Sequence, residues 1–95
     1  MDKSLNKIKP MLNPKVKWRY DNNVVLLVFK EKDKPMGLYE LNNEVGYLFE
    51  LCTGNNSYLD IKKKFEHKYS GKSELLDSLD SLVEQFYRMG ILTKE

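Results

Sequence analysis

The sequence feature that most constrains the fold is a change in the spacing of apolar residues near position 42. Before it, apolar residues alternate with charged ones over residues 16–20 and form a short β-branched run over residues 24–29. After it, they recur every three or four residues. The first spacing is typical of strands and the second of helices. The chain is therefore predicted to place its strands before its helices.

Three strands are predicted, over residues 16–20, 24–29 and 36–41. The turn-forming residues 21–23 and the polar residues 30–35 separate them. Short connections of this kind favour an antiparallel meander. The unbroken apolar run of residues 24–29 is typical of a strand covered on both faces.

Three helices are predicted to follow. Asn42 or Asn43 suits the N-cap of the first, and Ser57, with Asp60 three residues on, suits the start of the second. Ser73 is expected to cap the last helix, and Gly90 to end it. We expect the residues after Gly90 to fold back onto the core.

Together these elements predict an α+β domain with a winged-helix-turn-helix-like arrangement, in which a three-stranded antiparallel sheet is followed by three helices. The chain has 95 residues, enough for one domain. Residues 1–13 are expected to form an N-terminal arm, and residues 14–95 the folded domain.

Composition narrows the class of protein. With 41% hydrophobic and 32% charged residues and no long apolar run, the chain is expected to be a globular, cytoplasmic protein. Cys52 is the only cysteine and is expected to be a small buried apolar residue; His67 is the only histidine. No metal-ligand spacing, phosphate-binding loop or nucleophile with a plausible base is present, so we predict a non-catalytic protein without metal or cofactor.

The last helix carries two apolar stripes. One has enough residues to bury the helix, and the other is displaced from it by one position, flanked by Asp80 and Glu84. The first stripe is Leu75, Leu79, Leu82, Phe86 and Met89, and the second is Leu76, Val83 and Tyr87. Either both stripes form one wide buried arc, or the second lines a groove that is open to a partner.

The third predicted strand offers a matching surface. It has neither an internal proline nor a lysine, the usual protection of an edge strand. An extended peptide could pair with it by β-augmentation and direct its side chains toward the last helix. The same edge would allow a strand-paired dimer as an alternative to a monomer.

Five segments in this order and spacing resemble the PqqD family, the recognition elements for precursor peptides in pathways of ribosomally synthesised and modified peptides. They are residues 16–21 (VKWRYD), 24–27 (VVLL), 37–42 (GLYELN), 49–54 (FELCTG) and 89–92 (MGIL). The resemblance spans residues 14–92, which would then be a PqqD-like peptide-recognition domain. The lysine-rich residues 30–35 and the ending Gly-Ile-Leu favour a peptide pathway other than that of pyrroloquinoline quinone.

The resemblance implies that the chain captures the leader segment of a precursor peptide between the third strand and the third helix. It would then present the peptide to a modifying enzyme, commonly a radical S-adenosylmethionine enzyme, and in related systems a leader peptidase or cyclase. Carried onto this chain, the peptide-binding residues are Met36, Gly37, Leu38, Tyr39, Glu40, Leu41, Leu76, Asp80, Val83, Glu84 and Tyr87. Asp80 and Glu84 would favour a basic residue of the leader.

Two other functions fit the same fold. A winged helix can bind DNA, but the last helix holds four acids (Glu74, Asp77, Asp80 and Glu84) against Arg88, which opposes contact with phosphates. The basic run of residues 62–64 on the middle helix is the feature that favours DNA. A small protein-interaction domain of another kind is the second alternative.

Overall fold

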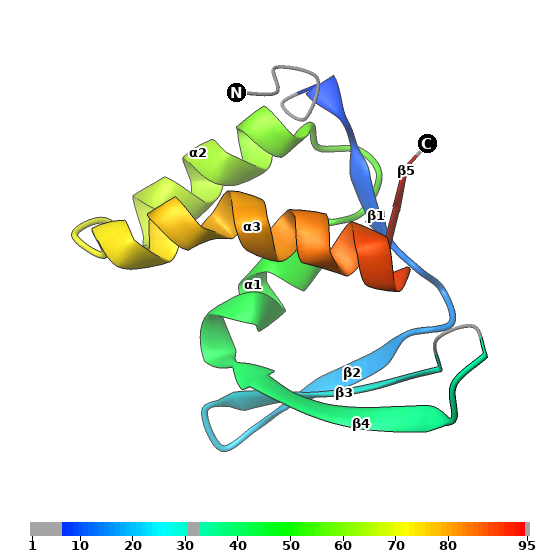
Figure 1. Cartoon of the computed structure of the whole chain (residues 1–95). Coiled ribbons are helices and arrows are strands. Elements are labelled where there is room, and N and C mark those ends of the chain that lie inside the picture. The colour runs from blue at the N-terminus through cyan, green and yellow to red at the C-terminus, as the bar shows by residue number, and fades with distance from the viewer. Residues whose placement is uncertain (1–6, 31–32, 95) are drawn as a thin grey trace.

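The computed structural model describes residues 7–30 and 33–94 of the chain (Figure 1). The elements, in chain order, are β1 (Pro10–Leu12), β2 (Lys17–Asp21), β3 (Val24–Lys30), β4 (Met36–Asn42), α1 (Asn43–Leu51), α2 (Tyr58–Lys68), α3 (Ser73–Met89) and β5 (Leu92–Lys94). The predicted α+β class, with three antiparallel strands followed by three helices, is confirmed. β1 and β5 were not predicted.

The main sheet is antiparallel, with β3 between β2 and β4. Asn22 and Asn23 join β2 to β3 with φ values of 51° and 70°. Two residues with positive φ are what a tight hairpin that matches the twist of its strands requires, and asparagine tolerates them. In the resulting register, Leu27 of β3 lies opposite Trp18 of β2 and opposite Tyr39 of β4.

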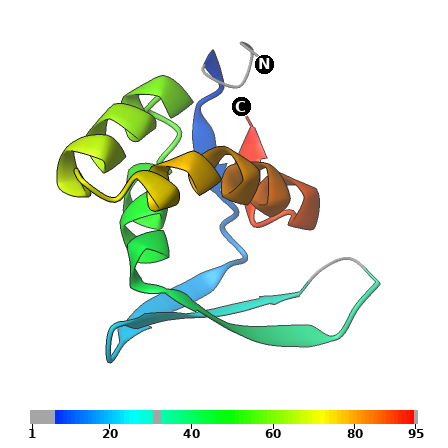
Figure 2. The ribbon, with the colours of Figure 1, turned by 60° about the vertical axis from the view of Figure 1, so that its left-hand side comes forward.

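The helices all lie on one face of this sheet (Figures 1 and 2). On that inner face, Val25, Leu27 and Phe29 are buried, whereas on the outer face Val24, Leu26 and Val28 are only half-buried and Lys30 is exposed. The expectation that β3 is covered on both faces is therefore wrong. Three of its four outer residues are apolar, but no described element packs over them.

Helix α1 connects the sheet to α3. The Phe49 ring meets Trp18 of β2 edge-on, with 5.4 Å between the ring centroids, and meets Phe86 of α3 at 5.6 Å. Phe49 and Phe86 are buried, so the contacts lie within the core. One aromatic side chain of α1 thus joins both layers of the domain.

The predicted helix boundaries are largely confirmed. Asn42 is the N-cap of α1, and the Ser57 hydroxyl accepts a hydrogen bond from the Asp60 amide at 3.2 Å at the start of α2. Gly90 ends α3 in the left-handed conformation. α3 begins at Ser73 itself, with Lys72 as its N-cap, so Ser73 is not the cap that was predicted.

The two ends of the domain are tied together by a second, two-stranded sheet. β1 pairs with β5 in antiparallel register, so Pro10–Leu12, assigned above to the arm, are part of the fold. The Asn13 side chain donates a hydrogen bond to the Gly90 carbonyl at 2.9 Å. Ile91 and Leu92 are buried, as predicted. Residues 1–6 of the expected arm lie outside the described residues.

Gly46 of α1 lies beneath the ring of Tyr20, and a Cβ at this position would overlap the ring. The Tyr20 hydroxyl donates a hydrogen bond to Glu50 Oε2 at 2.6 Å. Burial, together with the hydrogen bond and charge of Glu50, raises the pKa of Tyr20 to about 12. The glycine therefore allows the ring to lie across the helix.

We predict that Gly46→Ala lowers the free energy of unfolding by about 1 kcal/mol, because the methyl group displaces the Tyr20 ring. In an unconstrained helix the same change would stabilise by about 1 kcal/mol. The sign should reverse in a Tyr20→Ala background, where the helix propensity of alanine alone remains. Urea denaturation of the four proteins measures both effects. Stabilisation by Gly46→Ala in both backgrounds would contradict this account.

Candidate functional site

The edges of the main sheet differ in their protection. The β2 edge strand carries Lys17 and Arg19, and charged side chains discourage another strand from pairing. The β4 edge strand has the sequence MGLYELN, with one charged residue, Glu40. The predicted third strand is thus confirmed as an edge, and its outer side offers backbone hydrogen-bonding groups to an added strand.

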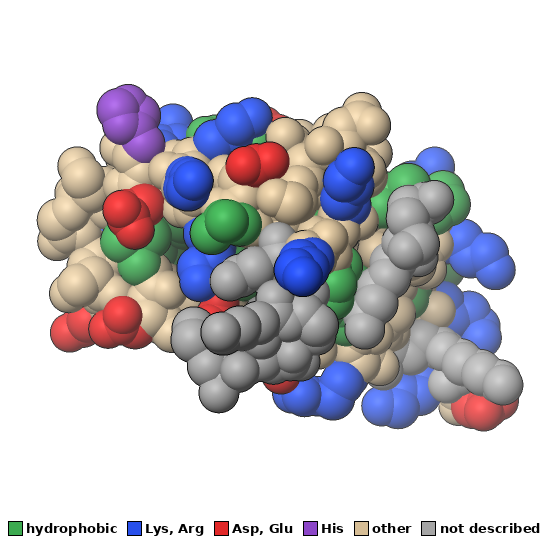
Figure 3. All heavy atoms as spheres, turned by 90° about the horizontal axis from the view of Figure 1, so that it is seen from above, with side chains coloured by type: hydrophobic (Ala, Val, Ile, Leu, Met, Phe, Trp, Pro, Cys, Tyr) green, Lys and Arg blue, Asp and Glu red, His purple; other side chains and the backbone are tan. Residues whose placement is uncertain are grey.

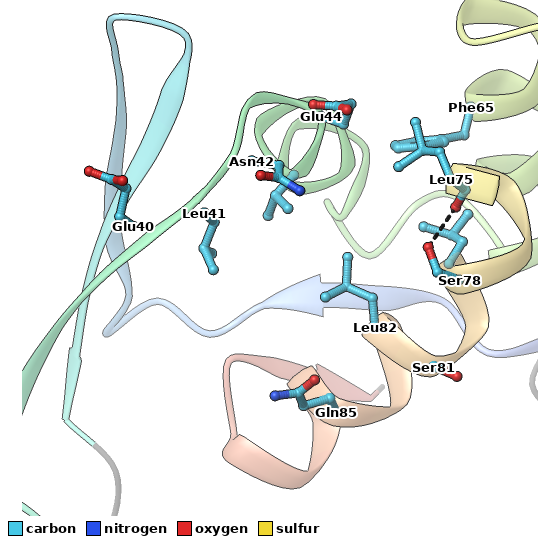
Figure 4. A pocket seen from close by; sticks show the side chains of 12 residues that line it. Glu40, Leu41, Asn42, Glu44, Phe65, Leu75, Ser78, Ser81, Leu82 and Gln85 are labelled. Atoms are coloured by element: carbon cyan, nitrogen blue, oxygen red, sulfur yellow. Dashed lines mark hydrogen bonds between the residues drawn. The ribbon is translucent and has the colours of Figure 1, made fainter. Parts of the chain in front are cut away.

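A hollow of about 410 Å³ lies between the carboxyl end of β4, the start of α1 and α3. Leu41 of β4 and Leu82 of α3 point into this space, whereas Glu40 points away from α3 (Figure 4). Val45, Phe65 and Leu79 also contribute to the lining. At this end of the edge strand, the hollow therefore combines apolar side chains with polar ones such as Glu44 and Gln85.

A second hollow, of about 770 Å³, lies near the other end of β4. Met36, Phe29 and Lys30 line it from the sheet, and Tyr87 and Met89 from the last turn of α3. The structure therefore brings Met36 and Tyr87 to one hollow, two residues that the sequence assigned to the same site. The two hollows lie at opposite ends of β4.

Between the two hollows, Tyr39 lies over Gly37. A Cβ on Gly37 would come within 2.8 Å of the Tyr39 hydroxyl oxygen and 2.9 Å of its ring. The two residues occupy the same face of β4, opposite Phe29 and Leu27 of β3. Glycine at position 37 thus lets the Tyr39 ring lie flat along the inner face of the strand.

The side of α3 that faces β4 differs from the side predicted. Val83 has no exposed surface, and with Leu79 and Phe86 it forms the buried line of the helix. This line runs between the two predicted stripes. Val83 is therefore a core residue, and the second stripe does not line an open groove as a unit.

Leu75 and Leu82, which the sequence assigned to the core, are half-buried and line the first hollow together with Ser78, Ser81 and Gln85. The sequence reasoning missed these five residues. The sequence did hold a sign of this for Leu75 and Leu82, because two apolar stripes on one helix cannot both lie at the centre of its buried side. Choosing between them required the contacts of α3 with α1 and α2, which come from the tertiary fold.

Asp80, predicted to meet a basic residue of the peptide, instead joins α3 to α2. The buried Tyr58 hydroxyl donates a hydrogen bond to Asp80 Oδ1, and Lys62 Nζ lies 3.7 Å from the same oxygen. Burial, the hydrogen bond and the negative charge of Asp80 raise the pKa of Tyr58. Glu84 is exposed, and Leu76 is half-buried; neither lines the two hollows beside β4.

The cysteine and the histidine, the two side chains considered for catalysis, differ in their exposure. Cys52 is buried, as predicted, and burial raises the pKa of its thiol to about 12. His67 is exposed on α2. Within residues 7–30 and 33–94, no three side chains of His, Cys, Asp or Glu gather as metal ligands. In the same part of the chain, no helix is both long and apolar enough to cross a bilayer.

The basic residues of α2 lie outside the two hollows beside β4. On the face that carries α2 and the β1–β5 pair, Lys and Arg side chains are spread among acidic and uncharged ones (Figure 3). Lys62 lies beside Asp80, and its ammonium group is 5.5 Å from the centre of the Tyr58 ring. Lys63 and Lys64 are exposed.

Comparisons of the chain with protein-family models, with curated proteins and with solved structures found no match.

We predict that Asp80→Ala lowers the free energy of unfolding by about 1–2 kcal/mol, since a hydrogen bond to a charged group is worth about 1.5–3 kcal/mol and Asp80 is partly exposed. Asp77→Ala is the matched control, because it makes the same change at an exposed position of α3. Urea denaturation compares the two. Equal effects would show that Asp80 does not hold α2 and α3 together.

Proposed function

We propose that this chain is a non-catalytic module of winged-helix-like fold that captures an extended peptide as an additional strand beside β4. The observation that carries the proposal is the position of an unprotected edge strand alongside two hollows that α3 also lines. Backbone hydrogen bonds to β4 would supply affinity, and the hollows would select side chains.

The dimensions of the cleft suit such a ligand. A strand rises about 3.3 Å per residue, so the path from Met36 to Leu41 is about 17 Å. A peptide segment of about six residues therefore reaches from one hollow to the other. The volume of each hollow falls within the roughly 300–1,000 Å³ of ordinary ligand pockets.

The class of peptide and the partner come from the family resemblance. We propose that the peptide is the leader segment of a ribosomally made precursor in the cytoplasm, and that the partner is a modifying enzyme, most simply a radical S-adenosylmethionine enzyme. The module would contribute no cofactor. By tethering the precursor, it would raise the local concentration of the segment to be modified.

The proposal predicts that Leu82→Gln weakens the binding of peptides selected from a random phage-displayed library by about tenfold or more, since burying a leucine side chain is worth about 1.5–3 kcal/mol. Leu59→Gln is the control, because Leu59 is an exposed leucine of α2. Fluorescence anisotropy with a labelled peptide gives the affinities, and urea denaturation checks that both variants are folded. Equal losses in the two variants would place the peptide elsewhere.

Amide chemical shifts of the ¹⁵N-labelled protein provide a second measurement on the same peptide. We expect the largest changes in β4 and along the side of α3 that bears Leu75 and Leu82. Changes centred on α2 would contradict binding in this cleft.

The natural partners are expected to be encoded nearby. We predict a short peptide reading frame and a reading frame for a modifying enzyme beside the gene for this chain. Sequencing the flanking DNA checks this. A neighbourhood made of transcriptional regulators would instead favour the DNA-binding alternative.

A further inference from the structure

By register, the side chains of β4 on the outer face of the sheet are two apolar residues followed by one acid. Met36, Leu38 and Glu40 lie opposite Lys30, Val28 and Leu26 of β3, so they share the outer face of the sheet. The side chains of Met36 and Leu38 are 63% and 71% exposed, far more than is usual for large apolar residues in a strand. The hollows on the inner face do not account for this exposure of Leu38.

A strand added beside β4 would cover these residues. Residues directly opposite each other in paired strands project from the same face, with their Cβ atoms about 4.5–5.5 Å apart. Alternate side chains of a bound peptide would therefore lie beside Leu38 and Glu40. The remaining side chains would point inward, toward the hollows that α3 lines.

Glu40 gives this outer row of contacts a charge preference. In its cross-strand row, Leu26 separates Glu40 from Arg19 of β2. Two strand spacings amount to about 9.5 Å, roughly twice the separation expected for a directly opposite residue of an added strand. A cation on the peptide would therefore interact with Glu40 at shorter range than Arg19 does.

We infer that the peptide bound by β4 carries a lysine or arginine opposite Glu40 and an apolar residue two positions away, opposite Leu38. This inference rests on the proposed function and adds the residue types that the edge strand selects. It moves the selection of a basic residue from Asp80 and Glu84 of α3, as expected from the sequence, to Glu40 of β4. The inward-facing residue between the two selected positions lies opposite Tyr39.

The test uses a random phage-displayed peptide library selected against the wild-type protein. Peptides with a basic residue two positions from an apolar one should be enriched. Cross-strand charge pairs are worth about 0.2–1 kcal/mol, and opposite signs become like signs in Glu40→Lys, so this variant should bind an enriched peptide roughly two- to thirtyfold more weakly. Selection against Glu40→Lys should enrich acidic residues at the same position.

Glu66→Lys is the matched control, because it makes the same change of net charge at an exposed glutamate of α2. It should leave the affinity within about twofold. Equal weakening by the two variants, or binders without the basic–apolar spacing, would overturn the inference while leaving peptide capture by β4 intact. A wild-type selection that yields no binder would overturn the proposed function, and this inference with it.

Discussion

The contact on which the architecture depends is the position of Phe49 between Trp18 of the sheet and Phe86 of α3. A domain of 95 residues has room for one small core, so each layer must be fixed by a few large side chains. Phe49 comes from α1, the helix that directly follows β4 in the chain. Helix α1 therefore both follows the edge strand directly and, through Phe49, contacts α3.

Three further contacts hold α3 along its length, and they come from elements other than β4. Asp80 accepts a hydrogen bond from Tyr58 of α2, the Gly90 carbonyl accepts one from Asn13, and Leu92, which follows the helix, pairs with Leu12 of β1. These supports keep one side of α3 facing β4 across the hollows rather than packed tightly onto it. The cleft is thus a consequence of how the helix is anchored.

The sequence was sufficient for most features that a local rule decides, the Ser73 cap being an exception. Hairpin asparagines, the Ser57 cap and the alternating strands each depend on neighbouring residues only, and they were predicted from those residues. The rotation of α3 was not predictable in this way. Both apolar stripes have helical spacing, and contacts of α3 with other elements, such as Phe86 with Phe49 and Asp80 with Tyr58, decide which leucines are buried. The short strands β1 and β5 were missed because a three-residue pairing across 82 positions leaves no periodic signal.

The difference between the two sheet edges bears directly on the proposed function. An unprotected edge strand exposes a chain to unwanted pairing, and β2 shows the ordinary protection in Lys17 and Arg19. On β4, the corresponding outward positions hold Met36, Leu38 and a single acid. Charge on every outward position would repel any added strand. One acid beside two apolar residues would instead select among added strands by their charge. An edge with this composition would favour basic, apolar strands over acidic ones, so the charge selectivity proposed for β4 depends on one residue, Glu40.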